Sequence, residues 1–396
     1  METGQEMKDR CYLDYNATAP LKDEVISSME KAFTIYGNPS SIHYEGRTAR
    51  GLMEDSRDVI ASTLSVTSDR LIFTSGGTES NNLAIKSSIK NKNIKKIFVS
   101  PTEHPSVLDV IKSSGVNFQI IKVDQNGVVD LKHLASSLEE NENSLVSVMY
   151  ANNETGVIQP IEKIVEIAKL TNSIVHCDGV QALGKLDFNI DNMGLDFITF
   201  SGHKVGGPKG IGLLVIGKNA DIYAENLGGG QEMGRRSGTE NFLGIIGLAT
   251  AIEACTKDLK RISETKALRD FLEKSALSIS PDSIVHGFAA DRLPNTLSIS
   301  MPMIESAVQL VAFDLKGISI SSGSACSSGK VEESHVLKAM NVNANHSRCS
   351  IRVSIGSNTT KDEILRFLEV WSELKQKQLY EYANLSEGSI INVASN

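Results

Sequence analysis

Short apolar runs alternate with stretches of helical periodicity over the first two thirds of the chain. The stretch 161–170, for example, repeats apolar residues at the spacing of one helix face. Strands that alternate with helices in this way predict βαβ units and a mostly parallel sheet. Because ligands bind at the carboxyl ends of such strands, the polar residues that follow each run are candidate site residues. The predicted strands are 71–77, 95–100, 118–123, 144–150, 173–178 and 195–201.

The last third of the chain has shorter strands and predicts a second, smaller α+β domain. A helical stretch from about residue 241 to 277 connects the two regions. The final residues, 384–396, are expected to form a loosely held tail. The predicted strands of this region are 295–301, 318–322 and 348–356, and its predicted helices are 305–315, 334–340 and 361–379.

Composition and charge indicate an ordinary globular protein. The chain has 396 residues, 40% of them hydrophobic and 22% charged, with a formal net charge of −8. This acidic balance argues against nucleic-acid binding as the main role, although it leaves a local basic patch open. The N-terminus, METGQEMKDR, lacks the apolar core of a secretory signal, and no run approaches the ~20 apolar residues of a membrane span. None of the five cysteines forms a CxxC pair, so we expect a soluble, cytoplasmic protein without a disulfide framework.

Lys204 is a candidate cofactor anchor. It follows an apolar strand in the sequence SGHK (201–204) and precedes the glycine-rich segment 206–212, which allows close backbone approach. A lysine can form a Schiff base with an aldehyde cofactor, and pyridoxal phosphate is the commonest such partner. The alternative is an ordinary solvated lysine.

Asp178 ends another apolar strand, in the sequence HCDGVQ (176–181). A carboxylate there needs a positive partner, and the protonated pyridine nitrogen of the cofactor is one. Gln181 is close enough in sequence to bond another ring substituent. The alternative is that Asp178 caps the next helix.

The sequence SGGTESNN (75–82) predicts a phosphate cradle. A strand, two glycines and a threonine precede a helix, so free N–H groups and the positive helix end would face an anion. Thr78 would supply a hydroxyl and act as the N-cap, with Asn81 and Asn82 behind it. Plain helix capping is the alternative.

His104 follows a strand and precedes a proline, which favours an extended backbone. Its flat ring could stack on a cofactor or shuttle a proton, although a structural role is the alternative. None of the eight histidines shows HxxxH or HExxH spacing, so we expect no zinc site.

Cys326 lies in the most informative stretch, SSGSACSSGK (321–330). Small residues surround the thiol, which predicts an exposed, mobile loop, whereas structural cysteines are usually buried. Cys177 and Cys255 fit that buried description. A thiol must be activated as thiolate to act as a nucleophile, and only Lys330 is near in sequence, so a base must come from elsewhere.

Arg352 lies inside the alternating strand SIRVSIG (350–356), where a guanidinium needs a partner. Both arms of its fork could bind a substrate carboxylate. A salt bridge to an acidic side chain of the protein is the alternative.

Together these residues resemble the cysteine desulfurases of the IscS and NifS type, within the fold-type-I aminotransferase superfamily. The pairing of SGHK with SSGSAC in one chain is the most specific part of this resemblance. The matching motifs are YLDYNATAP (12–20), GNPSSIH (37–43), SGGTESNN (75–82), TEHPSV (102–107), NNETG (152–156), HCDGVQ (176–181), SGHKVGGPKGIG (201–212), GGGQEMGRRSGTEN (228–241), SSGSAC (321–326) and IRVSIG (351–356).

The resemblance implies an α/β, fold-type-I pyridoxal-phosphate transferase with a mostly parallel seven-stranded sheet. It implies a large domain over 15–258 and a small α+β domain formed by 1–14 and 259–396, which carries the cysteine loop at about 321–330. It also implies a homodimer that removes sulfur from L-cysteine and leaves L-alanine. The sulfur would pass as a persulfide to an iron–sulfur scaffold or another acceptor protein for thiolation.

The resemblance also implies a role for each matching residue. Catalysis would use Lys204 as cofactor anchor and base, Cys326 as persulfide carrier, and His104, which would stack on the ring. Asp178 and Gln181 would bind the pyridine nitrogen and ring hydroxyl, and Asn153 and Arg352 the substrate carboxylate. The phosphate would be held by Gly77, Thr78, Ser201 and His203, and by Thr239 from the other subunit.

Two departures and two rivals qualify the resemblance. Met233 stands where family members usually have arginine, and the C-terminal tail does not resemble the IscS tail that meets the scaffold protein.

The nearest rival function is that of an aminotransferase or a selenocysteine lyase. An aminotransferase has no use for the thiol loop, and a selenocysteine lyase carries its cysteine in another motif. A scaffold without activity is a further rival, although both Lys204 and Cys326 are present.

Overall fold

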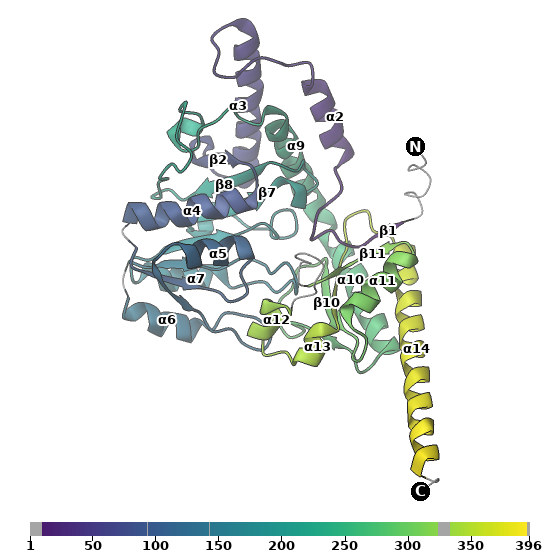
Figure 1. Ribbon diagram of the computed structural model, residues 1–396. Coiled ribbons are helices and arrows are strands. Elements are labelled where there is room, and N and C mark those ends of the chain that lie inside the picture. Colours follow the sequence, from purple (N-terminus) through teal and green to yellow (C-terminus); the bar gives the residue numbers. More distant parts are fainter. Residues whose placement is uncertain (1–9, 93, 142, 324–332, 394–396) are drawn as a thin grey trace.

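A computed structural model describes residues 10–92, 94–141, 143–323 and 333–393. Cys326 therefore lies outside the described residues. Figure 1 shows a larger part, built around one sheet and its helices, beside a smaller part along which the last helix runs.

A seven-stranded sheet forms the centre of the larger part, in the order β2-β8-β7-β6-β5-β3-β4. Only β8 is antiparallel to its neighbours, so the predicted mostly parallel sheet is confirmed. The six strands predicted from the sequence are all present. The seventh, β8, was missed because its apolar run directly follows the glycine-rich segment. The strands are β2 (Leu71–Thr74), β3 (Lys96–Val99), β4 (Asn117–Ile120), β5 (Leu145–Ser147), β6 (Ile174–Asp178), β7 (Phe197–Ser201) and β8 (Gly212–Ile216).

Helices cover both faces of this sheet because its central strands are buried on both sides. Alternate residues enter different cores: Phe197 packs with α4 and α5, whereas Ile198 packs in the core that contains α3 and α9. The helices are α2 (Asp23–Ala32), α3 (Tyr44–Leu64), α4 (Gly77–Lys92), α5 (Pro105–Ser113), α6 (Leu131–Glu139), α7 (Ile161–Lys169), α8 (Ile190–Met193) and α9 (Phe242–Asp258).

The smaller part contains a four-stranded antiparallel sheet in the order β12-β13-β10-β9. The N-terminal strand β1 (Cys11–Tyr12) pairs in parallel with β11 (Ile318–Ser319), so the chain begins in this part and then crosses to the larger one. The other strands are β9 (Ile284–Val285), β10 (Thr296–Ser300), β12 (Ser321–Ser322) and β13 (Ser350–Ser354).

Stacked aromatic rings join the helices of the smaller part. Phe313 of α11 stacks on Phe367 of α14 at 4.5 Å between centroids, and Phe367 stacks in turn on Trp371. Trp371 is fully buried, and its indole N–H donates to Ala276 O of α10 at 3.1 Å. The helices are α10 (Ile262–Ile279), α11 (Ser306–Leu315), α12 (His335–Ala339), α13 (Ala344–Arg348) and α14 (Lys361–Val393).

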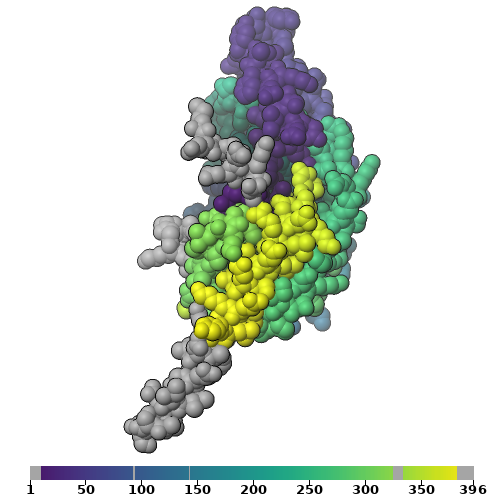
Figure 2. All heavy atoms as spheres, turned by 90° about the vertical axis from the view of Figure 1, so that its right-hand side faces the viewer, coloured from purple at the N-terminus to yellow at the C-terminus, as the bar shows by residue number. Residues whose placement is uncertain are grey.

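Helix α14 is longer than the sequence pattern predicted. It continues to Val393, through most of the segment that we expected to be a loose tail. Figure 2 shows its first turns lying across the face of the smaller part. No helix in the described parts of the chain is long and apolar enough to cross a membrane.

We propose that the boundary near residue 258 separates two domains. The predicted long helix from 241 to 277 is in fact broken, because a 3-10 turn, η4 (Leu259–Arg261), separates α9 from α10. The buried residues of α9 pack in the core of the large sheet, whereas those of α10 pack with α14 in a separate core. These separate cores support the division into 15–258 on one side and 1–14 with 259–396 on the other.

A buried ion pair fixes the loop 228–240 to the edge of the large sheet. Arg57 of α3 donates to the Glu232 carboxylate at 2.7 Å and to Leu71 O, and the same carboxylate accepts from Phe73 N. Glu232 and Met233 both have left-handed backbone angles, with φ of 47° and 57°. Such angles cost energy in residues other than glycine, so the contacts of Glu232 must hold the loop in place.

We predict that Glu232→Ala lowers the free energy of unfolding by about 3–5 kcal/mol, because it leaves the buried Arg57 guanidinium without its main partner. Glu54→Ala is the matched control, since it removes a half-exposed partner of the same arginine and should cost about 1 kcal/mol or less. Urea unfolding measures both. Equal losses in the two variants would contradict the assignment.

Candidate active site

A cavity of about 750 Å³ lies where the carboxyl ends of the large sheet meet the smaller part. Strands β6 and β7 end at Asp178 and Ser201, and the 3-10 turn η2 (Gly202–Lys204) follows directly. Because neighbouring parallel strands end at the same edge, these side chains come together although their motifs are separate in sequence. The cavity is lined by Gly77, Thr78, His104, Asn153, Asp178, Gln181, Ser201, His203, Lys204 and Arg352.

Two residues of the predicted site are not among those that line the cavity. Cys326 lies outside the described residues. Thr239 lies on the loop 228–240, which has no residue among those lining the cavity.

Lys204 is held by backbone carbonyl groups rather than by a carboxylate. Its Nζ donates to Asn16 O at 2.7 Å and to Ala17 O at 2.9 Å. Burial, with a further contribution from the positive charge of Arg352, lowers the pKa of Lys204 to about 8, although Asp178 and Asp14 oppose the shift. At pH 7 roughly a tenth of the side chain is then the neutral amine, which is the form that attacks an aldehyde.

Asp178 sits at the end of a buried hydrogen-bonded chain. Its Oδ2 accepts from Asn81 Nδ2 at 2.8 Å, Asn81 Oδ1 contacts His176 Nε2 at 3.1 Å, and His176 Nδ1 contacts Ser147 Oγ at 2.9 Å. Asp178 Oδ1 accepts from Val180 N in a local turn. No α-helix starts there, since the next one begins at Ile190, so the helix-capping alternative is wrong.

The phosphate-cradle motif forms the first turn of α4, beside a separate surface hollow of about 400 Å³. Because α4 begins at Gly77, Thr78 is inside the first turn, and its predicted role as N-cap is wrong. A Cβ atom on Gly77 would lie 3.0 Å from Val180 Cγ2, so glycine allows the tight approach. The hollow is also lined by Ser201, His203 and Lys209, which suits an anion at the positive helix end.

Two of the histidines that line the cavity, His104 and His203, are neutral near pH 7. Burial lowers the pKa of His203 to about 4, and the charges of Lys204 and Lys209 add to this effect. Burial also lowers the pKa of His104. His104 Nδ1 accepts from Ser106 N at 3.1 Å as the N-cap of α5, which assigns its proton to Nε2. Its structural role is thus present, and the ring still lines the cavity.

Arg352 combines the two alternatives raised by the sequence. Its Nη2 forms an ion pair with Asp14 Oδ1 at 2.7 Å, and its Nη1 donates to Asn153 O at 3.0 Å. Its Nε is buried without a hydrogen-bond partner. The guanidinium lines the cavity and keeps donor capacity for an anionic group there.

Residues 324–332, which include Cys326, are called the cysteine segment below. The described residues on both sides of it contact the large part next to the cavity. After the segment, Ser334 Oγ donates to Glu154 Oε2 at 2.5 Å and His335 Nε2 lies 2.9 Å from Glu103 O. Before it, a Cβ atom on Gly323 would approach Glu154 Oε2 to 2.6 Å, so a larger residue would require the Glu154 carboxyl group to move.

The four described cysteines are poor nucleophiles. Cys11, Cys177, Cys255 and Cys349 are all buried, as predicted for Cys177 and Cys255. Burial raises the pKa of Cys11 and of Cys255 to about 12, so neither forms an appreciable amount of thiolate near pH 7. Within the described residues, no group of three or more His, Cys, Asp or Glu side chains could hold a metal ion.

The donor set of the cavity fits pyridoxal phosphate. A lysine with a lowered pKa, a buried carboxylate on the neighbouring strand and a helix N-terminus match an aldehyde, a pyridinium nitrogen and a phosphate. The unpartnered Arg352 Nε adds a donor for a carboxylate. Sequence reasoning did not identify Asn16 or His176 as part of this site, although a histidine inside the apolar run of β6 was a signal for a buried polar network.

Comparisons with known proteins find a matching family and several similar chains. The model of the family described as aminotransferase class-V matches residues 11–367. A cysteine desulfurase IscS of Dictyoglomus turgidum is 40% identical, over 94% of this chain and 96% of the relative. A cysteine desulfurase NifS of Azotobacter vinelandii is 38% identical, over 90% of each chain. A solved NifS-like protein from Rickettsia africae has a TM-score of 0.85 at 37% identity, covering 93% of this chain and 99% of that one.

We predict that His176 makes the protein sensitive to acid. Burial lowers the pKa of His176 to about 4, below the ~6.5 of an exposed histidine. As the pH falls below about 6.5, this histidine binds a proton in the unfolded chain but not in the folded protein. The free energy of unfolding therefore falls with pH.

This contribution amounts to about 2 kcal/mol between pH 7 and pH 5. His176→Gln keeps a donor and an acceptor but does not titrate, so it should remove about that much of the pH dependence. Urea unfolding at the two pH values measures it. An unchanged pH dependence in the variant would show that the ring titrates normally.

Proposed function

Because the chain belongs to the class-V aminotransferase family, we propose that it is a pyridoxal-phosphate-dependent cysteine desulfurase. It removes sulfur from L-cysteine, leaves L-alanine and carries the sulfur as a persulfide on Cys326. The observation that carries this proposal is a convergence: a lysine of lowered pKa, a buried carboxylate and both flanks of the cysteine segment meet at one cavity.

Pyridoxal phosphate, when bound, supplies an electron sink for bond breaking at the substrate α-carbon. In the proposed site Lys204 would anchor it, Asp178 would pair with its pyridine nitrogen, and Gln181 would bond its ring hydroxyl. His104 would stack on the ring. The phosphate is held by Gly77, Thr78, Ser201 and His203.

Lys204 is the proposed base. Its amine accepts the proton from the substrate α-carbon, because a pKa of about 8 makes the neutral form accessible near pH 7. The carbonyls of Asn16 and Ala17 hold the amine in the cavity without adding a full negative charge.

Asn153 and Arg352 are the proposed partners of the substrate carboxylate. The two residues already contact each other through Asn153 O, and Asp14 fixes the other arm of the guanidinium. An arginine held in this way keeps a planar donor edge for a carboxylate, which orients the substrate before reaction.

Cys326 is the proposed sulfur acceptor. Its thiolate attacks the substrate sulfur, a sulfur–sulfur bond forms, and the carbon–sulfur bond breaks with its electrons left on carbon. Protonation of that carbon, together with return of the proton from the Lys204 amine to the α-carbon, then gives alanine. The contacts of Ser334 and His335 after the segment, and the position of Gly323 before it, support this role because they bring both ends of the segment to the cavity.

We predict that the purified protein releases alanine and, with a thiol reductant, sulfide from L-cysteine. Lys204→Ala should lose both products because the cofactor loses its anchor and base. Cys326→Ser should still bind the cofactor but should form no protein persulfide, which mass spectrometry detects. Cys255→Ser is the matched control, because its buried thiol should contribute nothing. A parent protein that binds the cofactor but transfers amino groups to keto acids instead would favour the aminotransferase alternative.

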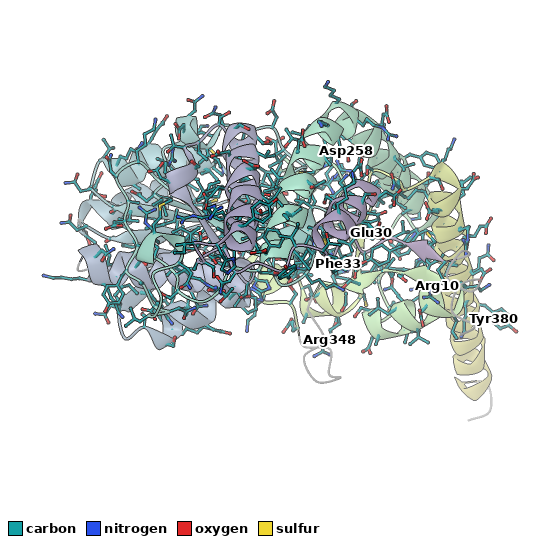
Figure 3. The ribbon with its side chains drawn as sticks, turned by 90° about the horizontal axis from the view of Figure 1, so that it is seen from above. Arg10, Glu30, Phe33, Asp258, Arg348 and Tyr380 are labelled. Atoms are coloured by element: carbon teal, nitrogen blue, oxygen red, sulfur yellow. The ribbon has the colours of Figure 1, made fainter. Side chains whose placement is uncertain are left out.

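We also propose that the active unit is a homodimer in which Thr239 of the partner subunit contacts the phosphate. The loop 228–240 is fixed by Arg57 and by the ion pair of Arg236 with Glu79, yet it does not line its own cavity. Exposed apolar residues lie on and after α2, among them Phe33 at the end of the helix (Figure 3), Tyr36 and Ile42. Burying them between subunits would remove that apolar area from water.

We predict a mass in solution of twice the 42.9 kDa chain by analytical ultracentrifugation. Thr239→Ala should weaken cofactor binding roughly tenfold, since it removes one hydrogen bond to a charged group. Thr63→Ala, at a half-buried position of α3 that is not among the residues lining the cavity, is the control. A monomer with undiminished cofactor affinity would contradict the proposal.

We propose that the enzyme works in the cytoplasm and delivers its sulfur to a protein acceptor. An iron–sulfur scaffold and another sulfur-accepting protein for thiolation are the two kinds of acceptor that the desulfurase reaction suits. The proposal involves neither a nucleic acid nor a membrane as direct partner.

A further inference from the structure

Asn16 lies between two cavities and connects their polar residues. It is 1% exposed. Its backbone carbonyl accepts from Lys204 Nζ at 2.7 Å and from Gln181 Nε2 at 2.9 Å. Its side-chain Oδ1 accepts from Lys185 Nζ and from Asn295 Nδ2, both at 3.1 Å. Any movement of Asn16 would therefore change the positions of both Lys204 and Gln181.

Lys185 reaches this network from the far side. It lines a second cavity of about 340 Å³ between the two parts of the molecule, whereas Gln181 lines the proposed cofactor cavity and Lys204 borders both. Lys185 Nζ donates to Gln181 Oε1 at 2.5 Å. The proposed mechanism gives this second lysine no task.

The contacts with Asn16 and Lys185 together set which way the Gln181 carboxamide faces. A backbone carbonyl can only accept, so the atom of Gln181 beside Asn16 O must be the nitrogen, and the Gln181 oxygen is the atom that accepts from Lys185 Nζ. The Gln181 nitrogen then donates one hydrogen to Asn16 O. Its second hydrogen is left for an acceptor in the cavity that Gln181 lines. With the amide flipped, Gln181 would present an oxygen instead, which repels an anionic ring oxygen.

The position of Lys185 also places a second nitrogen cation near Lys204. Burial lowers the pKa of Lys185 to about 7, and the charges of Lys204 and Arg352 contribute to the shift. Arg352 opposes the protonation of Lys204, while Asp178 and Asp14 favour it. Lys185 thus acts on Lys204 through Asn16, whereas the charge of Lys204 lowers the pKa of Lys185.

We propose that Lys185 is a positioning residue of the cofactor site, which fixes the Gln181 carboxamide and Asn16 from the second cavity so that Gln181 presents an N–H donor to the cofactor ring oxygen. This inference rests on the proposed function as far as the cofactor is concerned. It requires no desulfurase activity.

The test compares Lys185→Met, which keeps the chain length but has no donor or charge, with Lys185→Arg, which keeps both. Lys22→Met is the matched control, because Lys22 lines the same second cavity but pairs with Asp258. Apoprotein is titrated with pyridoxal phosphate to obtain the dissociation constant. The visible absorbance of the loaded protein is then followed against pH.

Lys185→Met should raise the dissociation constant about tenfold, which corresponds to one hydrogen bond of ~1.4 kcal/mol. The absorbance midpoint should move to higher pH, because Gln181 no longer holds an N–H donor against the anionic ring oxygen, and a hydrogen bond to the charged form favours that form. Lys185→Arg should stay within about threefold of the parent and keep the midpoint, and Lys22→Met should match the parent in both.

An unchanged dissociation constant and midpoint in Lys185→Met, with only a loss of unfolding stability, would overturn the inference by showing that Lys185 serves packing alone. If Lys185→Met does not fold, Lys185→Gln carries the same test of the midpoint. If the unsubstituted protein binds the cofactor but releases no alanine, the desulfurase proposal is wrong, and the dissociation constants and midpoints of the Lys185 variants still test the inference. A parent that does not bind the cofactor would overturn both.

Discussion

The contact of residues 14–17 with the carboxyl edge of the large sheet is the constraint on which the rest of the site depends. Arg352 and Lys204 are two cations in one partly buried cavity, and each needs a partner. Asp14 pairs with Arg352, whereas Asn16 and Ala17 offer only backbone carbonyls to Lys204. Carbonyl groups order the amine without the full negative charge that would raise its pKa towards the value in water. The segment thus holds Lys204 in place and leaves it reactive.

The large sheet and most lining residues of the cavity could be predicted from the sequence because their signals are local. Asp178 and Ser201 each end an apolar run that is a strand in the structure, and a parallel sheet brings such ends together. The prediction failed where two local signals overlapped. The apolar run of β8 begins at Gly212, the last residue of the glycine-rich segment, so the segment was interpreted only as a loop. Threonine favours the N-cap position, which predicts that role for Thr78, but α4 begins at Gly77, one residue before Thr78.

The polar network behind the cavity could not be predicted in the same way, because its contacts join distant parts of the chain. Asn16 meets Lys185 and Lys204 across more than 150 residues. Nothing next to Lys185 in sequence distinguishes it from a solvated lysine, and only burial creates its need for partners. His176 is the exception. It stands inside the apolar strand β6, and a buried imidazole must find hydrogen bonds, which Ser147 and Asn81 supply.

Glu154 extends the same logic to the cysteine segment. It directly follows Asn153, and its carboxyl group contacts Ser334 on one flank of the segment and lies against Gly323 on the other. Burial raises the pKa of Glu154, although Ser334 and the charges of His335 and Arg352 oppose this shift. A carboxyl group in so dry a position is stable only while its partners stay in place. One short stretch of backbone therefore sets both the proposed contact to the substrate carboxylate and the contacts of Gly323 and Ser334, the residues on either side of the cysteine segment.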